Sequence, residues 1–172
     1  MIYNFAFMLW GEYYAYNHQF ARYNQKLSEY NLLLCIQTFC NDVVKGRYML
    51  DKTHSLHDKY IKSLQQDIYN LLYEMITVLA YKNSYHDYSM DSMINNINTF
   101  LHINVKNYID NLSNKLHNLQ TIGSDYISME DIENLGYTIY QIYDILKFNI
   151  EFTPTLEISF DNTQPLIKFA YG

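Results

Sequence analysis

The chain of 172 residues is long enough for one domain with its own core, and it carries a formal net charge of −6. This acidic balance argues against duplex nucleic acid as a partner, because phosphate binding requires clustered positive charge. Five glycines and two prolines are too few for the many tight turns of a β-sandwich or barrel, and two cysteines cannot form a disulfide scaffold. The composition therefore indicates a mainly helical, soluble domain.

Tyrosine is unusually frequent, with 19 residues, and asparagine and isoleucine are almost as common. Two explanations stay open. An A/T-rich genome, such as that of a virus or phage, would favour the codons of all three residues. Alternatively, tyrosines suit a protein inside an assembly, because their rings pack while their hydroxyls meet water or a partner.

The first ten residues are strongly apolar but lack the basic region and cleavage site of a secretory signal. The run is also too short to span a bilayer, and Glu12 follows directly. We expect this end to pack into a core, either its own or that of a neighbouring chain.

Apolar residues in the first segment repeat every seven positions in two series, one from Ile2 to Tyr30 and one, offset by four, from Ala6 to Leu34. This spacing is typical of one face of a long helix. Lys45 and Gly46 then resemble a helix end, with a cation in the last turn and a glycine after it. The pattern predicts a first helix over about 9–45.

Three further stripes of apolar residues at helical spacing predict helices over 56–82, 90–120 and 129–147. Each is preceded by a serine and carries an acid in its first turn, a combination that favours a helix start. These pairs are Ser55 with Asp58, Ser89 with Asp91, and Ser128 with Asp131.

The last twenty residues change to the alternating pattern of strands. Pro154 blocks a helix, and two short runs, 156–160 and 166–171, flank an Asp-Asn turn. We therefore divide the chain into a helical bundle with an apolar N-terminal arm, 1–153, and a C-terminal β-hairpin, 154–172. An isolated hairpin is marginal in water, so it should lie on the helices or pair with another chain.

The predicted fold is mainly α, an elongated bundle of about four helices with a short C-terminal β-hairpin. A first helix of about 36 residues would be about 54 Å long, more than the roughly 40 Å diameter of a compact globule of this size. The residues that we expect in the core are Leu27, Leu34, Phe39, Leu64, Leu71, Leu112 and Leu135.

No pattern in the sequence predicts a catalytic site, a cofactor or a metal. His54 and His57 share a helical face, but no second ligand pair matches them, so a solvated helix start is the better interpretation. Cys35 and Cys40 fall on different sides of a helix and are interpreted as small buried residues of a reducing compartment.

The helical stripes of 9–45, 56–82, 90–120 and 129–147, followed by the strand pair, resemble the head–tail connector or adaptor proteins of tailed phages. This resemblance implies a ring of identical copies and no catalytic residue. It implies copies of itself and neighbouring structural proteins as partners, and a place in the virion after assembly in the host cytoplasm. We expect no sequence-specific nucleic acid and no membrane.

The alternative function is a small viral or phage inhibitor that binds a host defence protein, and a protein that is not viral would be cytoplasmic. For either function, we expect the two ends of the chain to carry the contacts with other chains. The predicted partner-binding residues are Ile2, Phe5, Phe7, Met8, Trp10, Leu156, Ile158, Phe160, Leu166, Ile167, Phe169 and Tyr171.

Overall fold

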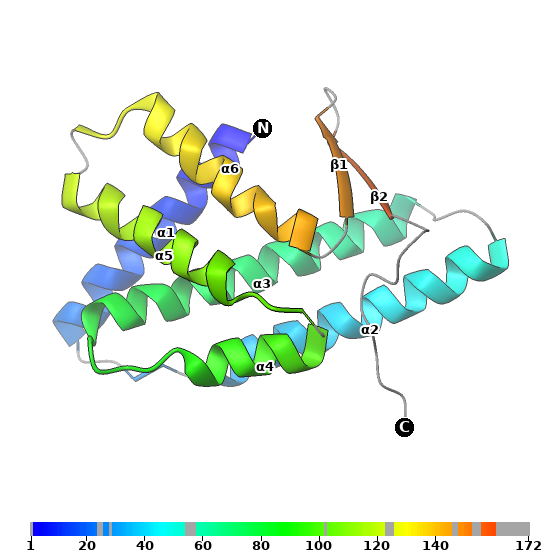
Figure 1. Ribbon diagram of the computed structural model, residues 1–172, viewed down its shortest axis with the longest axis horizontal. Helices are drawn as coiled ribbons and strands as arrows, with labels where there is room; N and C mark the ends of the chain where they lie inside the picture. The colour runs from blue at the N-terminus through cyan, green and yellow to red at the C-terminus, as the bar shows by residue number, and fades with distance from the viewer. Residues whose placement is uncertain are drawn as a thin grey trace.

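The computed structural model describes residues 2–23, 26–27, 29–53, 58–101, 103–122, 126–145, 148–152 and 156–160. This part of the chain is predominantly helical, as the sequence predicts (Figure 1). Its six helices are α1 (Ile2–Tyr23), α2 (Glu29–Thr53), α3 (Asp58–Ser84), α4 (Asp91–Leu101), α5 (Lys106–Ile122) and α6 (Met129–Ile145).

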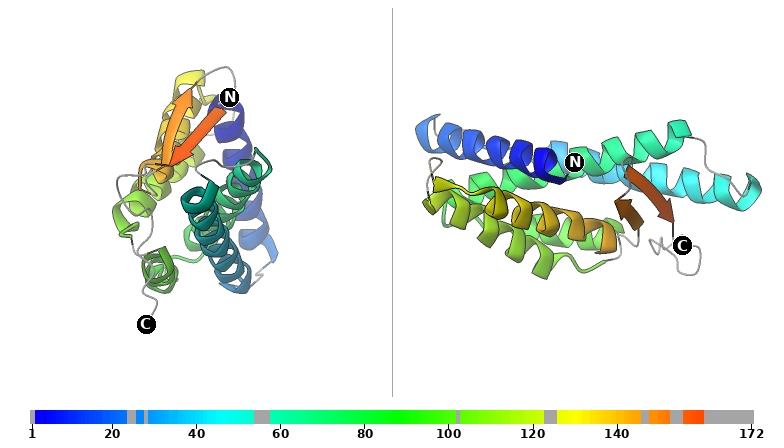
Figure 2. Two further views of the ribbon diagram at one scale, coloured as in Figure 1. Left: turned by 90° about the vertical axis from the view of Figure 1, so that its right-hand side faces the viewer. Right: turned by 90° about the horizontal axis from the view of Figure 1, so that it is seen from above.

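Helices α1 and α3 form the centre of the bundle. Helix α3 packs against α1 on one side and against α2 on another. Helix α1 also packs against α6, α4 lies against α2, and α5 lies against α6. Figure 1 and the right-hand view of Figure 2 both show the end of α2 and the beginning of α3 extending past the other helices. The molecule is therefore longer than it is wide, with a helical pair projecting at one end.

The predicted long helix over 9–45 is wrong, because two helices occupy this region. Helix α1 ends at Tyr23, Lys26 and Leu27 are not helical, and α2 begins at Glu29. The seven-residue repeat does not mark one buried face across the break, because its members in α2, Tyr30 and Leu34, are 69% and 48% exposed. Helix α2 also runs through Gly46 to Thr53, so the expected end at Gly46 is wrong too.

The predicted helix over 90–120 is likewise two helices, α4 and α5. The side-chain oxygen of Asn98 accepts a hydrogen bond from the backbone N–H of Val105 at 2.9 Å, and that of Asn104 accepts one from Lys106 at 3.1 Å. These bonds satisfy N–H groups that lack a partner at a helix start. The side chains of two asparagines thus mark the start of α5, although the apolar stripe of 90–120 shows no interruption there.

The start of α6 is confirmed at Met129. The backbone N–H of Asp131 donates to Ser128 Oγ at 3.1 Å, and the backbone N–H of Ser128 donates back to Asp131 Oδ2 at 3.0 Å. This reciprocal pair is a capping box with aspartate as its acid. The hydrogen bonds from the Ser128 side chain and backbone lower the pKa of the Asp131 carboxyl.

One continuous core joins all six helices. Of the residues predicted for it, Phe39, Leu71, Leu112 and Leu135 are fully buried. Leu27 is half-buried against the core, and the side chain of Leu64 lies outside the described residues. The prediction for Leu34 is wrong. Its side chain is 48% exposed, because α2 is a separate helix with its own buried face, formed by Leu32, Ile36, Phe39 and Cys40.

Two strands follow α6. Strand β1 (Phe148–Phe152) pairs antiparallel with β2 (Leu156–Phe160), with Ile150 opposite Ile158. The sequence predicts a strand over 156–160 but none over 148–152, and its other predicted strand, 166–171, lies outside the described residues. Backbone contacts between α6 and β1 place this strand pair near the end of α6.

Candidate functional site

The apolar N-terminal run belongs to helix α1 and divides between two faces. The Phe5 ring packs 5.6 Å from Tyr69 of α3 and 5.9 Å from Tyr140 of α6, measured between ring centroids. Trp10 is only 8% exposed. These two predicted partner-binding residues therefore contribute mainly to the bundle's own packing, and the side chain of Ile2 lies outside the described residues.

The outer face of α1 carries a row of aromatic rings. Ring centroids lie 6.0 Å apart for Phe7 and Trp10, 5.6 Å for Trp10 and Tyr14, and 4.5 Å for Tyr14 and His18. These spacings of three and four residues align the rings along one side of the helix. We call Phe7, Trp10, Tyr14 and His18 the aromatic row.

The aromatic row is open to solvent at its edge. Phe7 is 53% exposed and His18 is also exposed. Gly11 lies on the same side of the helix, and no atom from elsewhere in the described chain lies within 4 Å of where its Cβ would be. The bundle thus leaves α1 uncovered at Gly11, although Trp10 beside it is buried. Met8 is 43% exposed, and its sulfur accepts a hydrogen bond from the Tyr69 hydroxyl at 3.9 Å.

The indole nitrogen of Trp10 is buried and has no hydrogen-bond partner among the described residues. A buried N–H without an acceptor is destabilising and is uncommon in folded proteins. The row therefore contains a donor whose hydrogen-bonding capacity is unused.

The C-terminal partner-binding residues can be placed only partly. Leu156, Ile158 and Phe160 lie in β2, whose backbone is described but whose side chains are not. The residues Leu166, Ile167, Phe169 and Tyr171 lie outside the described residues. Within the described chain the sheet has two strands, so each strand has one outer edge that no described strand covers.

A network of polar side chains, which the sequence does not predict, joins α1, α3 and α5. Gln120 Oε1 accepts hydrogen bonds from Asn17 Nδ2 and Asn83 Nδ2, both at 2.9 Å, and Ser84 Oγ donates to Asn17 Oδ1 at 3.1 Å. His117 Nδ1 lies 2.9 Å from Asn83 Oδ1. A satisfied network of this kind specifies how helices align, and we assign it a structural role.

Two carboxylates meet between α2 and α3. Asp42 accepts hydrogen bonds from Ser63 Oγ at 3.1 Å and Lys45 Nζ at 3.2 Å. Burial, together with the nearby Asp42 carboxyl, raises the pKa of Asp67 to about 7. Although burial opposes it, hydrogen bonds from Asp67, Lys45 and Ser63 hold the pKa of Asp42 below its usual value. We call Asp42 and Asp67 the acid pair, which keeps one proton, on Asp67, up to about neutral pH.

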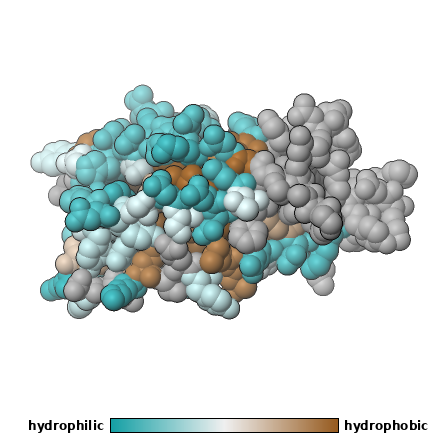
Figure 3. Space-filling view, turned by 60° about the horizontal axis from the view of Figure 1, so that its bottom comes forward, coloured by the Kyte–Doolittle hydropathy of each residue, from teal (hydrophilic) through white to brown (hydrophobic). Residues whose placement is uncertain are grey.

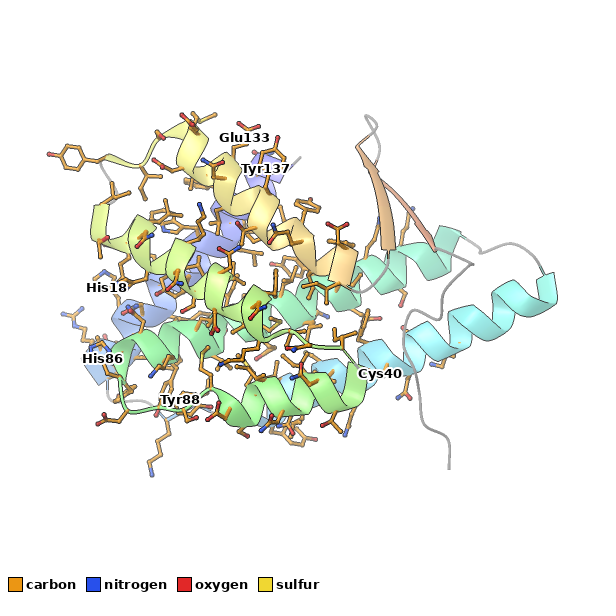
Figure 4. All side chains as sticks on the ribbon, in the orientation of Figure 1. His18, Cys40, His86, Tyr88, Glu133 and Tyr137 are labelled. Carbon is orange, nitrogen blue, oxygen red and sulfur yellow. The ribbon has the colours of Figure 1, made fainter. Side chains whose placement is uncertain are left out.

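The residues considered for metal or redox chemistry do not form a site in the described part of the chain. His54 and His57 lie outside it, and no group of three potential ligands comes together among the residues that are described. His18 and His86 lie at the same end of the bundle (Figure 4). Cys40 is buried and Cys35 is half-buried. Burial raises the pKa of Cys40 to about 12.

The surface elsewhere alternates between polar and apolar side chains. Figure 3 shows the side of the molecule where α4 lies as mostly hydrophilic, with separate hydrophobic patches. Among the described helices, none combines the length and apolar character needed to cross a bilayer.

Comparisons with known proteins add no relative. No protein-family model matches the chain, and neither a curated protein nor a solved structure is significantly similar to it. The function must therefore be argued from the arrangement of its own residues.

Proposed function

We propose that the protein is a non-enzymatic structural subunit of a larger assembly and that it binds copies of itself through the outer face of α1. The observation that carries this proposal is the aromatic row, in which Phe7 is half exposed beside a stretch of helix that the bundle leaves uncovered. A neighbouring chain that covers this face would remove apolar surface from water, the main favourable term in most protein association.

The chemistry of the row fits a protein interface. Aromatic residues are enriched at the centres of interfaces, because they bury a large area at a small cost in side-chain entropy. The row thus offers apolar area at Phe7, beside the buried indole of Trp10.

The strand pair provides a second means of association. The outer edges of β1 and β2 present backbone donors and acceptors, and a strand from another copy could extend the sheet. A contact that joins different surfaces of identical chains closes into a ring when the rotation between the copies allows it.

The specific assembly that we propose is the ring that connects head and tail in a tailed phage, which would place the protein in the virion. A helical bundle with a terminal strand pair supports this proposal through its resemblance to such adaptors. The alternative is a viral or phage inhibitor of a host defence protein, which would use the same aromatic row on a different partner.

The oligomeric state of the full chain tests the proposal. Native mass spectrometry and light scattering should find closed homo-oligomers, and Phe7→Glu should convert them to monomers without loss of helical circular dichroism. Tyr126→Glu is the matched control, because Tyr126 is 80% exposed and lies outside α1. Its oligomers should be unchanged.

The same measurement separates the two functions. A protein that remains a monomer at every concentration would contradict the ring and favour the inhibitor. If the protein does assemble, deletion of 154–172 should abolish assembly while the helical signal stays. Unfolding of the helices in that truncation would show that the strands stabilise the bundle itself.

A further inference from the structure

A cavity of about 200 Å³ lies where α1 gives way to α2, against the side of α3. Three aromatic rings, those of Tyr16, Phe20 and Tyr73, form part of its wall. Its polar lining comes from Gln19, Asn31, Glu74 and Thr77, and Lys26 and Leu27 complete it. The volume is below the roughly 300–1,000 Å³ of pockets for drug-sized molecules, so an occupant must be small.

The aromatic side of the cavity is held in place by contacts between α1 and α3. The hydroxyls of Tyr16 and Tyr73 are hydrogen-bonded at 2.5 Å, and the Tyr16 and Phe20 rings stack with centroids 5.9 Å apart. Phe20 is also fixed by an edge contact with Tyr81 at 5.1 Å. The rings therefore form a prepared wall, and the faces of such rings attract cations.

Among the described residues that line the cavity, Glu74 is the only carboxylate. It is half-buried, and no hydrogen bond or ion pair joins it to another described residue. Burial raises the pKa of its carboxyl, as expected where a negative charge loses water without gaining a cation. A positively charged ligand would supply what this carboxylate lacks.

Other charges increase the preference for a cation. Burial, the hydrogen bond with Tyr16 and the nearby charges of Glu12 and Glu74 together raise the pKa of Tyr73. Burial raises the pKa of Cys35, with further contributions from Glu74 and Asp67. Two carboxylates, Glu12 and Glu74, therefore act on Tyr73 in the cavity wall. The opposing charge in the lining is Lys26, whose side chain is exposed.

We propose that this cavity binds a small organic ammonium ion, with the ammonium group against the Glu74 carboxylate and the alkyl part against the Tyr16, Phe20 and Tyr73 rings. Carboxylate and aromatic rings together are the combination that recognises alkylammonium groups in proteins. This site is independent of the aromatic row, which lies on another side of α1.

Two probes of similar size and opposite charge test the proposal. Butylammonium chloride and sodium butyrate are titrated separately into the full-length protein, and backbone amide shifts are followed by NMR at constant ionic strength. Butylammonium should bind saturably and shift the amides of Asn31, Glu74 and Thr77, whereas butyrate should not. Equal binding of both probes, or binding of neither, would overturn the proposal.

Two substitutions with opposite expected effects sharpen the test. Glu74→Gln keeps the shape of the side chain and removes its charge, so it should weaken butylammonium binding by roughly tenfold or more. Lys26→Met removes the competing cation and should strengthen binding. Glu133→Gln, an exposed acid on α6, is the control and should leave the affinity unchanged.

The variants also distinguish a ligand site from an internal contact. If the Lys26 ammonium group itself occupies the cavity in solution, Lys26→Met should lower the melting temperature of the protein. Restoration of the melting temperature by butylammonium would then support recognition of an ammonium group. An affinity for butylammonium that Glu74→Gln and Lys26→Met both leave unchanged would refute the site. Because Lys26 is exposed, that variant remains informative even if Glu74→Gln fails to fold.

Discussion

Helix α3 packs against α1 and α2 through two different kinds of surface. Toward α1 it presents aromatic rings, with Tyr69 against Phe5, Tyr73 against Tyr16 and Tyr81 against Phe20. Toward α2 it presents carboxylates at a spacing of seven, Asp67 and Glu74, which lie near Asp42 and Cys35. One contact consists mainly of apolar rings and the other includes groups that ionise.

The stability of the two contacts should therefore depend differently on pH. Ring packing has no charge to change, so the α1–α3 contact should keep its strength from acid to neutral pH. The acid pair repels itself when both carboxylates are ionised, so the α2–α3 contact should weaken as the pH rises.

Removal of a ring from the α1–α3 contact should have the largest effect. Phe20 is buried against Tyr81, and Phe20→Ala should lower the free energy of unfolding by about 3–5 kcal/mol. Urea denaturation measures this, and the loss should be the same at pH 5 and pH 8. Tyr23→Ala, in the same helix but 67% exposed, should change the value by about 0.5 kcal/mol or less.

The acid pair should make stability fall as the pH rises from about 4 to about 7. Unfolded Asp67 ionises near its ordinary pKa of 3.8, whereas folded Asp67 keeps its proton to about 7, so the folded state binds more protons in this window. The lowered pKa of Asp42 changes the stability only below this window, where the Asp42 carboxylate becomes protonated. Because the pair is partly open to water, which screens its charges, we expect a loss of about 1–2 kcal/mol.

Asp67→Asn tests this assignment. The amide can donate to Asp42 at every pH, whereas Asp67 can do so only while it keeps its proton, up to a pH of about 7. The variant should therefore flatten the pH dependence and be more stable than the parent at pH 8. The variant leaves in place Lys45, which donates a hydrogen bond to Asp42, and Cys35, which lies near Asp67. An undiminished pH dependence between pH 4 and pH 7 in the variant would assign it to other groups.

The hydroxyl pair within the ring contact should contribute less. Tyr16→Phe keeps the ring but removes the hydrogen bond to Tyr73, and it should lower the free energy of unfolding by about 0.5–1.5 kcal/mol. Tyr137→Phe, which removes an exposed hydroxyl bonded to Glu133, is the matched control on α6. A loss of several kcal/mol in Tyr16→Phe would mean that the contact depends on polar bonding more than on its rings.

The smallest effect is expected at Leu34, on the outward side of α2. Because its side chain is half exposed and alanine favours helix, Leu34→Ala should change the free energy of unfolding by about 0.5 kcal/mol or less. Thermal or urea denaturation is sufficient to measure it. A loss of about 2–5 kcal/mol would show that Leu34 belongs to the core and would contradict its position on the outward side of α2.

Local signals in the sequence predicted the fold best where side-chain capping residues mark the start of a helix. Ser128 and Asp131 predicted the start of α6. Leu112 of α5 and Leu135 of α6 are buried, as expected. The interruption between α1 and α2 was missed because an apolar repeat reports which side of a helix is buried, not whether the helix is continuous. Asn24 and Ser28, residues that favour helix ends, are the signal that could have marked it.

The candidate sites were predictable only in part for the same reason. An apolar N-terminal run was evident, but its division depends on which helices lie beside α1. Trp10 is buried and Phe5 is partly buried, whereas Phe7 and Met8 are exposed. The spacing of seven in Cys35–Asp42 and Asp67–Glu74 was present in the sequence. That these residues face each other follows only from the antiparallel pairing of α2 with α3.

By itself, the amino-acid sequence determined that the chain is mainly helical, because apolar spacing and capping residues act within one or two turns. It also determined that most of the predicted leucines and phenylalanines are buried, since burial follows from apolar area. The tertiary structure alone decided where α1 reverses into α2, which acids share a proton, and how three aromatic rings and Glu74 come to line one cavity. These features join residues far apart in the chain, and their energies depend on burial and distance, which no local pattern contains.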